Sequence, residues 1–110
     1  PTLLPSPLGG ERAVSVSAGG YHSLALTGSG ATWSWGGGGD GQLGHGDRQN
    51  QLLPKKVEAF ADQRVVAVSA GDGHSLALTA GGATWSWGEG GSGQLGHGDG
   101  QTQLLPKVIE

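Results

Sequence analysis

The sequence feature that most constrains the fold is a long internal repeat. The string HSLALT at residues 22–27 returns at 74–79, and the offset of 52 residues holds without a gap to the end of the chain. Between residues 13–58 and 65–110, 34 of 46 positions are identical, which indicates recent duplication or deliberate design. Repeats of this length are typical of propellers, solenoids and other arrays.

Each repeat contains four short segments with the character of β-strands. In the first unit they span residues 13–17, 23–27, 32–35 and 51–57. The glycine-rich connections at 18–22 and 28–31 are short and favour hairpins. Alternation places pairs of apolar residues on a common face, namely Val14 with Val16, Leu24 with Leu26, and Trp33 with Trp35. Four antiparallel strands in about fifty residues predict a propeller blade, and a solenoid, which more often has shorter repeats, ranks below it.

The repeat predicts an all-β chain with two propeller blades. We expect blade 1 at residues 13–58, a linker at 59–64 and blade 2 at 65–110. Residues 1–12 contain TLLPSPL, which resembles QLLPKKV and predicts an orphan outer strand followed by a linker. Pro5 and Pro7 make this segment the poorer strand, because neither can donate to a strand ladder, so we expect the C-terminal QLLPKVI to complete its blade in preference to it.

Composition excludes several classes of protein. Glycine supplies 24 of 110 residues, but it lacks the three-residue period of collagen, and the apolar patterning between the glycines argues against disorder. The formal charge of -3 and six scattered basic residues predict no binding to nucleic acid or to an acidic membrane surface. Cysteine is absent, which excludes disulfides and thiolate metal sites. No apolar run approaches the ~18–20 residues that cross a bilayer, so we expect a soluble protein.

Three motifs at fixed spacing carry a resemblance to a known family. The strings AGGYHSLALT, TWSWGGGGDGQLGHGD and QLLPKKV, at residues 18–27, 32–47 and 51–57, resemble the repeat of the regulator of chromosome condensation family. The resemblance covers nearly the whole chain and implies blades of a seven-bladed propeller, with S-W-G and G-Q-L-G-H-G as structural signatures. It implies that apolar residues of the second and third segments pack between blades: Trp33, Trp35, Trp85, Trp87, Leu24, Leu26, Leu76 and Leu78.

The glycine-rich loops satisfy two ligand motifs only in part. Residues 36–41 and 88–93 match G-x-G-x-x-G, but no helical pattern follows to face a dinucleotide phosphate. Aligned as a calcium repeat, they place Leu43 and Leu95 where an acid is required. We therefore expect no cofactor and no calcium.

The four histidines form two pairs, and each pair has one member in each repeat. The 52-residue period places the members of each pair on neighbouring blades, so we expect a role in stabilising turns, not in binding a metal, for His22, His45, His74 and His97. Ser23 and Ser75 follow two of these histidines, but a nucleophile also needs a base held across the site and an oxyanion hole. No catalytic residue is nominated, and we expect no enzymatic activity.

The family resemblance implies two activities that these residues do not carry over. Guanine nucleotide exchange depends on loops spread over a complete propeller, which two blades do not supply. In the plant UV-B photoreceptor of this fold, a G-W-R-H-T motif contributes to light sensing. The corresponding residues 19–23 and 71–75 read GGYHS and GDGHS, without tryptophan or arginine.

Two blades alone leave an apolar face open at each end, so we expect self-association. Because the units are nearly identical, the contact should be heterologous and should close a ring of three or four chains. The favoured interpretation is a non-catalytic module that self-assembles into a propeller scaffold or protein-interaction platform. The alternative is a piece of a larger propeller that acts as an exchange factor or UV-B photoreceptor. Polar loop tips are the expected contacts for other proteins: Asp47, Arg48, Gln49, Asp99 and Gln101.

Overall fold

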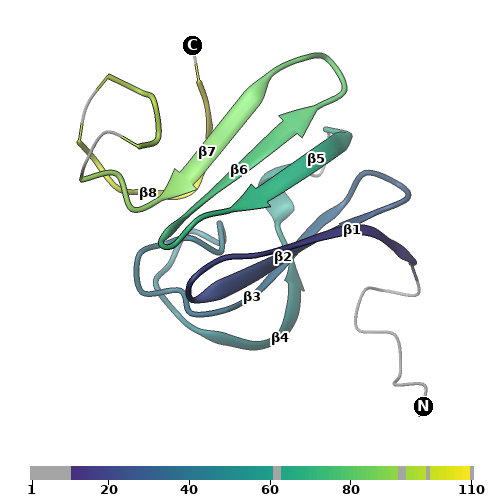
Figure 1. Cartoon of the computed structure of the whole chain (residues 1–110), viewed down its shortest axis with the longest axis horizontal. Helices are drawn as coiled ribbons and strands as arrows, with labels where there is room; N and C mark the ends of the chain where they lie inside the picture. Colours follow the sequence, from purple (N-terminus) through teal and green to yellow (C-terminus); the bar gives the residue numbers. More distant parts are fainter. Residues whose placement is uncertain (1–10, 61–62, 92–93, 99, 110) are drawn as a thin grey trace.

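The computed structural model describes residues 11–60, 63–91, 94–98 and 100–109. Their elements follow one another along the chain as two runs of four strands joined by a single turn of 3-10 helix (Figure 1): β1 (Ala13–Ala18), β2 (His22–Thr27), β3 (Thr32–Gly36), β4 (Gln51–Lys56), η1 (Glu58–Phe60), β5 (Val65–Ala70), β6 (His74–Thr79), β7 (Thr84–Gly88) and β8 (Gln103–Val108).

The strands form two separate antiparallel sheets in sequence order, β1-β2-β3-β4 and β5-β6-β7-β8 (Figure 1). Each sheet is a meander: short glycine-rich turns join its first three strands, and a longer loop, residues 37–50 in the first sheet, leads to the outer strand. The prediction of an all-β chain with two four-stranded blades is confirmed. We refer to the first sheet as blade 1 and to the second as blade 2.

The strand register sorts the side chains of each blade onto two faces. In blade 1, Leu24 lies opposite Ser34, and Ala25 lies opposite Trp33. Paired residues point to the same side of a sheet, so leucines and tryptophans occupy opposite faces. We call the side with Leu24 and Leu26 the leucine face, and the side with Trp33 and Trp35 the tryptophan face. Blade 2 has the same register, with Leu76 opposite Ser86 and Ala77 opposite Trp85.

The outer strands β4 and β8 carry a proline in mid-strand. Pro54 and Pro106 lack a backbone N–H, which is tolerated at a sheet edge and discourages the pairing of edges between molecules. Strand β8 pairs with β7, with Val108 opposite Trp85, so the C-terminal segment supplies the outer strand of blade 2 in this chain. The N-terminal segment TLLPSPL lies outside the described residues.

The hydrophobic core lies between the two sheets, not within either one. Blade 1 faces it with its leucine side and blade 2 with its tryptophan side, and Phe60 of η1 fills the space between them. The Phe60 ring lies 5.5 Å from the rings of both Trp85 and Trp87. The segment expected to be only a linker therefore contributes a buried aromatic residue. The cluster consists of Leu24, Leu26, Val57, Phe60, Val65, Ala77 and Trp87.

Candidate functional site

The joint between the two blades combines a hydrophobic core with hydrogen bonds from one blade to the other. It is heterologous, because the leucine face of blade 1 packs against the tryptophan face of blade 2. Leu24 and Trp87 are each 0% exposed, and both come from the middle strands of their sheets. The two sides of the joint are therefore different surfaces of one repeated unit.

A hydrogen-bonded cluster fixes the register of this joint. The Gln42 carbonyl accepts two bonds, from the Trp87 indole Nε1 at 2.8 Å and from the Ser75 hydroxyl at 2.8 Å. His22 Nε2 lies 2.7 Å from Ser75 Oγ. Since Ser75 donates its single hydrogen to Gln42, the His22 ring must donate to Ser75. We call these four residues, two from each blade, the clamp.

Burial determines the protonation of the clamp histidine. His22 is 3% exposed, and burial, together with the neighbouring His74, lowers the pKa of its ring below the ordinary value. The His22 Nδ1 atom is buried and has no hydrogen-bond partner. Burial therefore disfavours a second proton on this ring, although a hydrogen bond to the His74 backbone acts in the opposite direction, and the clamp favours a neutral histidine.

The loop between β3 and β4 also crosses from blade 1 to blade 2. The Gly46 N–H donates to the Leu104 carbonyl of β8 at 2.9 Å. Gly44 has a φ of +79°, and a Cβ at this position would lie 2.9 Å from the Trp87 Nε1 atom. Glycine is thus required for the left-handed turn and for the close approach of the loop to the indole.

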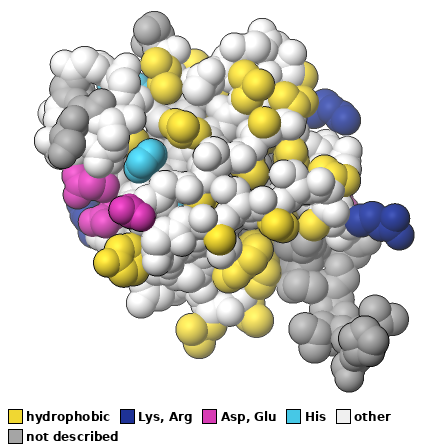
Figure 2. Space-filling view, viewed as in Figure 1, with side chains coloured by type: hydrophobic (Ala, Val, Ile, Leu, Met, Phe, Trp, Pro, Cys, Tyr) yellow, Lys and Arg dark blue, Asp and Glu magenta, His cyan; other side chains and the backbone are white. Residues whose placement is uncertain are grey.

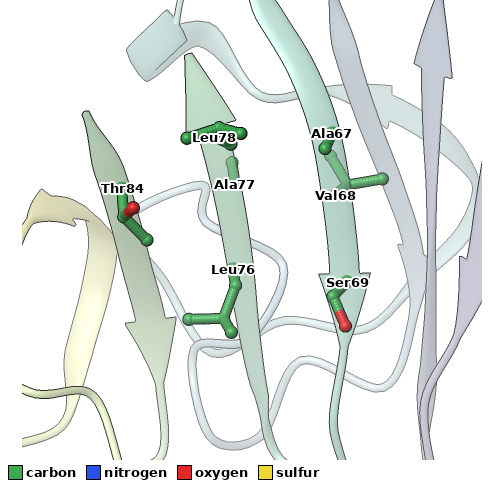
Figure 3. Close-up of a pocket in the computed structure, with 7 residues that line it drawn as sticks. All are labelled: Ala67, Val68, Ser69, Leu76, Ala77, Leu78 and Thr84. Carbon is green, nitrogen blue, oxygen red and sulfur yellow. The ribbon is translucent and has the colours of Figure 1, made fainter. Parts of the chain in front are cut away.

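Two faces of the described residues have no blade packed against them: the tryptophan face of blade 1 and the leucine face of blade 2. On the tryptophan face of blade 1, Trp35 is only half-buried, whereas Trp87 is fully buried. On the leucine face of blade 2, Leu78 is 39% exposed, whereas its counterpart Leu26 is 4% exposed. Figure 3 shows Leu76, Leu78 and Thr84 on the neighbouring strands β6 and β7 of this face. These residues help to line a shallow pocket of about 140 Å³.

The second histidine pair acts within each blade. His45 Nε2 lies 3.0 Å from Ser34 Oγ, and that hydroxyl donates to the Leu43 carbonyl at 2.7 Å. Blade 2 repeats the arrangement with His97 and Ser86 at 2.9 Å. Burial and the nearby Lys55 ammonium lower the pKa of His45. These contacts hold the glycine-rich loop against its own sheet and need no neighbouring blade.

The geometry around the histidines and serines does not build a nucleophile. Ser75 is fully buried, and its proton is directed to a backbone carbonyl, not to His22. No group of three or more potential metal-ligating side chains occurs among the residues that the structure describes. Within the same ranges, no helix has the length and apolar character needed to cross a membrane.

The loop tips expected to contact other proteins lie at the surface where they are described. Arg48 and Gln49 are exposed and Asp47 is half-buried, and the Arg48 guanidinium donates to the Gly39 carbonyl at 2.9 Å. Gln101 is exposed, and Asp99 lies outside the described residues. Figure 2 shows acidic side chains gathered at one margin of the molecule and hydrophobic side chains spread across the face between the margins.

Gln42 and Phe60 carry no sequence signal that predicts their place in this joint. Gln42 acts through its backbone carbonyl, which carries no side-chain signal. Phe60 lies in the short segment between repeats and has no counterpart at the repeat period, although it is the only phenylalanine in the sequence.

Comparisons with known proteins identify related repeats over most of the chain. Two models of the regulator of chromosome condensation (RCC1) repeat match, one at residues 29–78 and 81–110 and the other at 13–42 and 65–94. The E3 ubiquitin-protein ligase HERC2 of Homo sapiens is 46% identical over 97 residues, which cover 88% of this chain and 2% of that protein. The Ultraviolet-B receptor UVR8 of Arabidopsis thaliana is 40% identical over 111 residues, which cover 100% of this chain and 25% of the receptor.

Solved structures show the same arrangement of blades. Human WBSCR16 superposes with a TM-score of 0.84 at 32% identity, over 92% of this chain and 26% of that protein. Yeast RCC1 (Prp20), solved bound to Kap60, gives a TM-score of 0.84 at 27% identity, over 98% of this chain and 26% of its own. The chain spans about a quarter or less of each of these relatives.

Proposed function

Because the chain belongs to the family of regulator of chromosome condensation repeats, we propose that it is a non-catalytic pair of blades that assembles with further copies into a propeller scaffold for protein interactions. In this proposal, the polar loop tips Asp47 to Gln49 and the exposed Gln101 present the contact surface for other proteins. Three or four chains would close the ring, giving six or eight blades.

One observation carries this proposal, namely the different burial of identical residues in the two units. Trp87 is fully buried in the joint, and Trp35, at the same position of blade 1, is only half-buried. Complete burial of an aromatic side chain removes ~150–250 Å² from water, which is worth roughly 4–6 kcal/mol as an upper bound. Open faces of this kind favour association with another blade.

The test is native mass spectrometry combined with light scattering over a dilution series. We expect one species at three or four times the chain mass, and we expect Trp35→Ala to dissociate it, because this side chain lies on the open tryptophan face. Trp87→Ala should instead unfold the chain, since that side chain holds its two blades together. A wild-type chain that stays monomeric at high concentration would contradict self-assembly.

A second candidate function follows from the lengths of the relatives. The chain spans 25% of the Ultraviolet-B receptor and 26% of yeast RCC1, so the same two blades could form part of a longer propeller with activity elsewhere. In that case the open faces would be covered by blades of the same polypeptide. A monomeric or heterogeneous chain in the mass measurement supports this candidate over the ring.

A further inference from the structure

We propose that the leucine face of blade 2 in one copy docks on the tryptophan face of blade 1 in the next copy, with the geometry of the joint inside the chain. This inference rests on the proposed self-assembly and specifies which surfaces meet. It excludes contacts between two leucine faces or between two tryptophan faces.

The open face of each blade carries the counterparts of one half of the clamp. Ser23 and Trp35 of blade 1 correspond to the donors Ser75 and Trp87. His74 of blade 2 corresponds to His22, and the backbone at residue 94 corresponds to the Gln42 carbonyl. A head-to-tail contact brings the two halves together, whereas a contact between two tryptophan faces would place donors against donors, and a contact between two leucine faces would leave the carbonyl acceptors without the indole and hydroxyl donors.

Gly20 of blade 1 and Asp72 of blade 2 occupy equivalent positions but differ between the units. Inside the chain, a Cβ on Gly20 of blade 1 would lie 2.8 Å from the Asp72 carboxylate of blade 2, so this contact needs glycine on one side. Between copies, Asp72 of blade 2 would meet Gly20 of the next blade 1. The pairing is the same with the roles exchanged, so the difference between units does not obstruct the second joint.

Two apolar side chains are exposed in blade 1, while their counterparts in blade 2 are covered. Val16 is 69% exposed on β1, while its counterpart Val68 packs against the core cluster. Leu52 is 95% exposed on β4, while its counterpart Leu104 is half-buried where the blade 1 loop bonds to it. Both exposed residues belong to blade 1, the blade whose tryptophan face is open.

The experiment blocks one face at a time. Val16→Glu places a charge on the open tryptophan side, and Leu78→Glu places one on the open leucine face. Burial of an unpaired carboxylate is strongly unfavourable, so each variant alone should lose association by more than about 100-fold. Both side chains are exposed in the single chain, which should therefore keep its fold.

Mixing the two variants tests the direction of the joint. The Val16→Glu chain retains an intact leucine face and the Leu78→Glu chain retains an intact tryptophan face, so a one-to-one pair should form and grow no further. Recovery of this pair also demonstrates that both variants are folded. Leu52→Glu provides a second variant of the tryptophan side and should behave as Val16→Glu does.

Matched controls lie two residues from Val16 and at the equivalent position of blade 2. Val14 is 61% exposed and Val66 is 45% exposed, so this position stays at the surface whether or not its blade is covered. Val14→Glu and Val66→Glu should therefore assemble like the wild type.

The outcomes separate this inference from the proposed function. If the wild type is monomeric, both are overturned. If the wild type assembles but either blocked variant still assembles alone, if the mixture stays monomeric, or if the controls dissociate as readily, then the head-to-tail joint is wrong while self-assembly stands.

Discussion

At the scale of single residues, position in the joint decides what a side chain does. His22 and His74 share the same sequence context, yet His22 is buried in the clamp and His74 is half-buried beside it. Ser75 bonds across the joint to the Gln42 carbonyl of the other blade. The clamp is therefore a property of two blades in contact and not of either unit alone.

Stability of the joint should depend on pH through His22. The pKa of this ring is lowered in the folded chain, chiefly by burial and further by His74. Well above the ordinary histidine pKa of 6.5, the ring is neutral in both folded and unfolded chains, and the contribution of the clamp is complete. As the pH falls from there through the lowered pKa, the unfolded chain takes up a proton first, so the free energy of unfolding should decrease.

The measurement is urea unfolding of the Val16→Glu chain between pH 8 and pH 5, where assembly does not contribute. His22→Gln keeps a donor for Ser75 but cannot titrate, so it should reduce the slope without abolishing it, because the pKa of His45 is also lowered. An unchanged slope in His22→Gln would show that this ring does not control the pH response.

At the scale of elements, the loop between β3 and β4 connects blade 1 to blade 2. It is anchored to its own sheet by Ser34 and His45 and reaches β8 of blade 2 through Gly46. The loop therefore contributes both to its own blade and to the joint, which explains why its glycines sit so close to another sheet.

Gly44→Ala should destabilise the chain more than Gly96→Ala. Both glycines have a φ near +78°, at +79° and +77°, so the backbone cost of a side chain is common to both. At residue 44 the new methyl group would also press on the Trp87 indole, whereas at residue 96 it would meet Ile109 at 3.6 Å, an ordinary contact. We expect an extra loss of about 1–2 kcal/mol for Gly44→Ala.

Thermal or urea unfolding in the Val16→Glu chain measures this difference. Without assembly, the region around Gly96 has no blade packed against it, so the pair of variants compares this position with and without a neighbouring blade. At residue 44 the new methyl group would also lie 3.2 Å from Val57 Cγ1, a smaller contribution than the approach to the indole. Equal losses for the two substitutions would indicate that the loop does not press on the indole.

At the scale of the whole molecule, the chain has two different open ends, the tryptophan face of blade 1 and the leucine face of blade 2, which we propose to be complementary. Such ends generate either closed rings or open filaments, depending on the angle between successive blades. Seven blades cannot be made from whole pairs, so the proposed ring of three or four chains departs from the usual number of the resembled family.

Thermal stability should therefore depend on concentration. Partners that bind only the folded chain raise its melting temperature by mass action. We expect the melting temperature of the wild type to rise steadily over a hundredfold increase in concentration, and that of Val16→Glu to stay constant. Calorimetry or tryptophan fluorescence provides the measurement, and a constant value for the wild type would argue against assembly.

The fold class follows from local patterns in the sequence. The 52-residue period, the alternation in residues 23–27 and 32–35 and the glycine-rich turns are local signals, and they specify strands, hairpins and the number of blades without knowledge of distant contacts. The same signals indicated which apolar residues share a face, because that follows from the two-residue period of a strand.

Only the tertiary structure decided how the two blades use those faces. Identical residues such as Trp35 and Trp87 have identical local sequence, so no local pattern can tell which one is buried. The clamp joins Gln42 to Ser75 and Trp87 through a backbone carbonyl, which every residue possesses. Burial and hydrogen bonding between blades depend on which surfaces meet in space, and that information is not contained in either repeat alone.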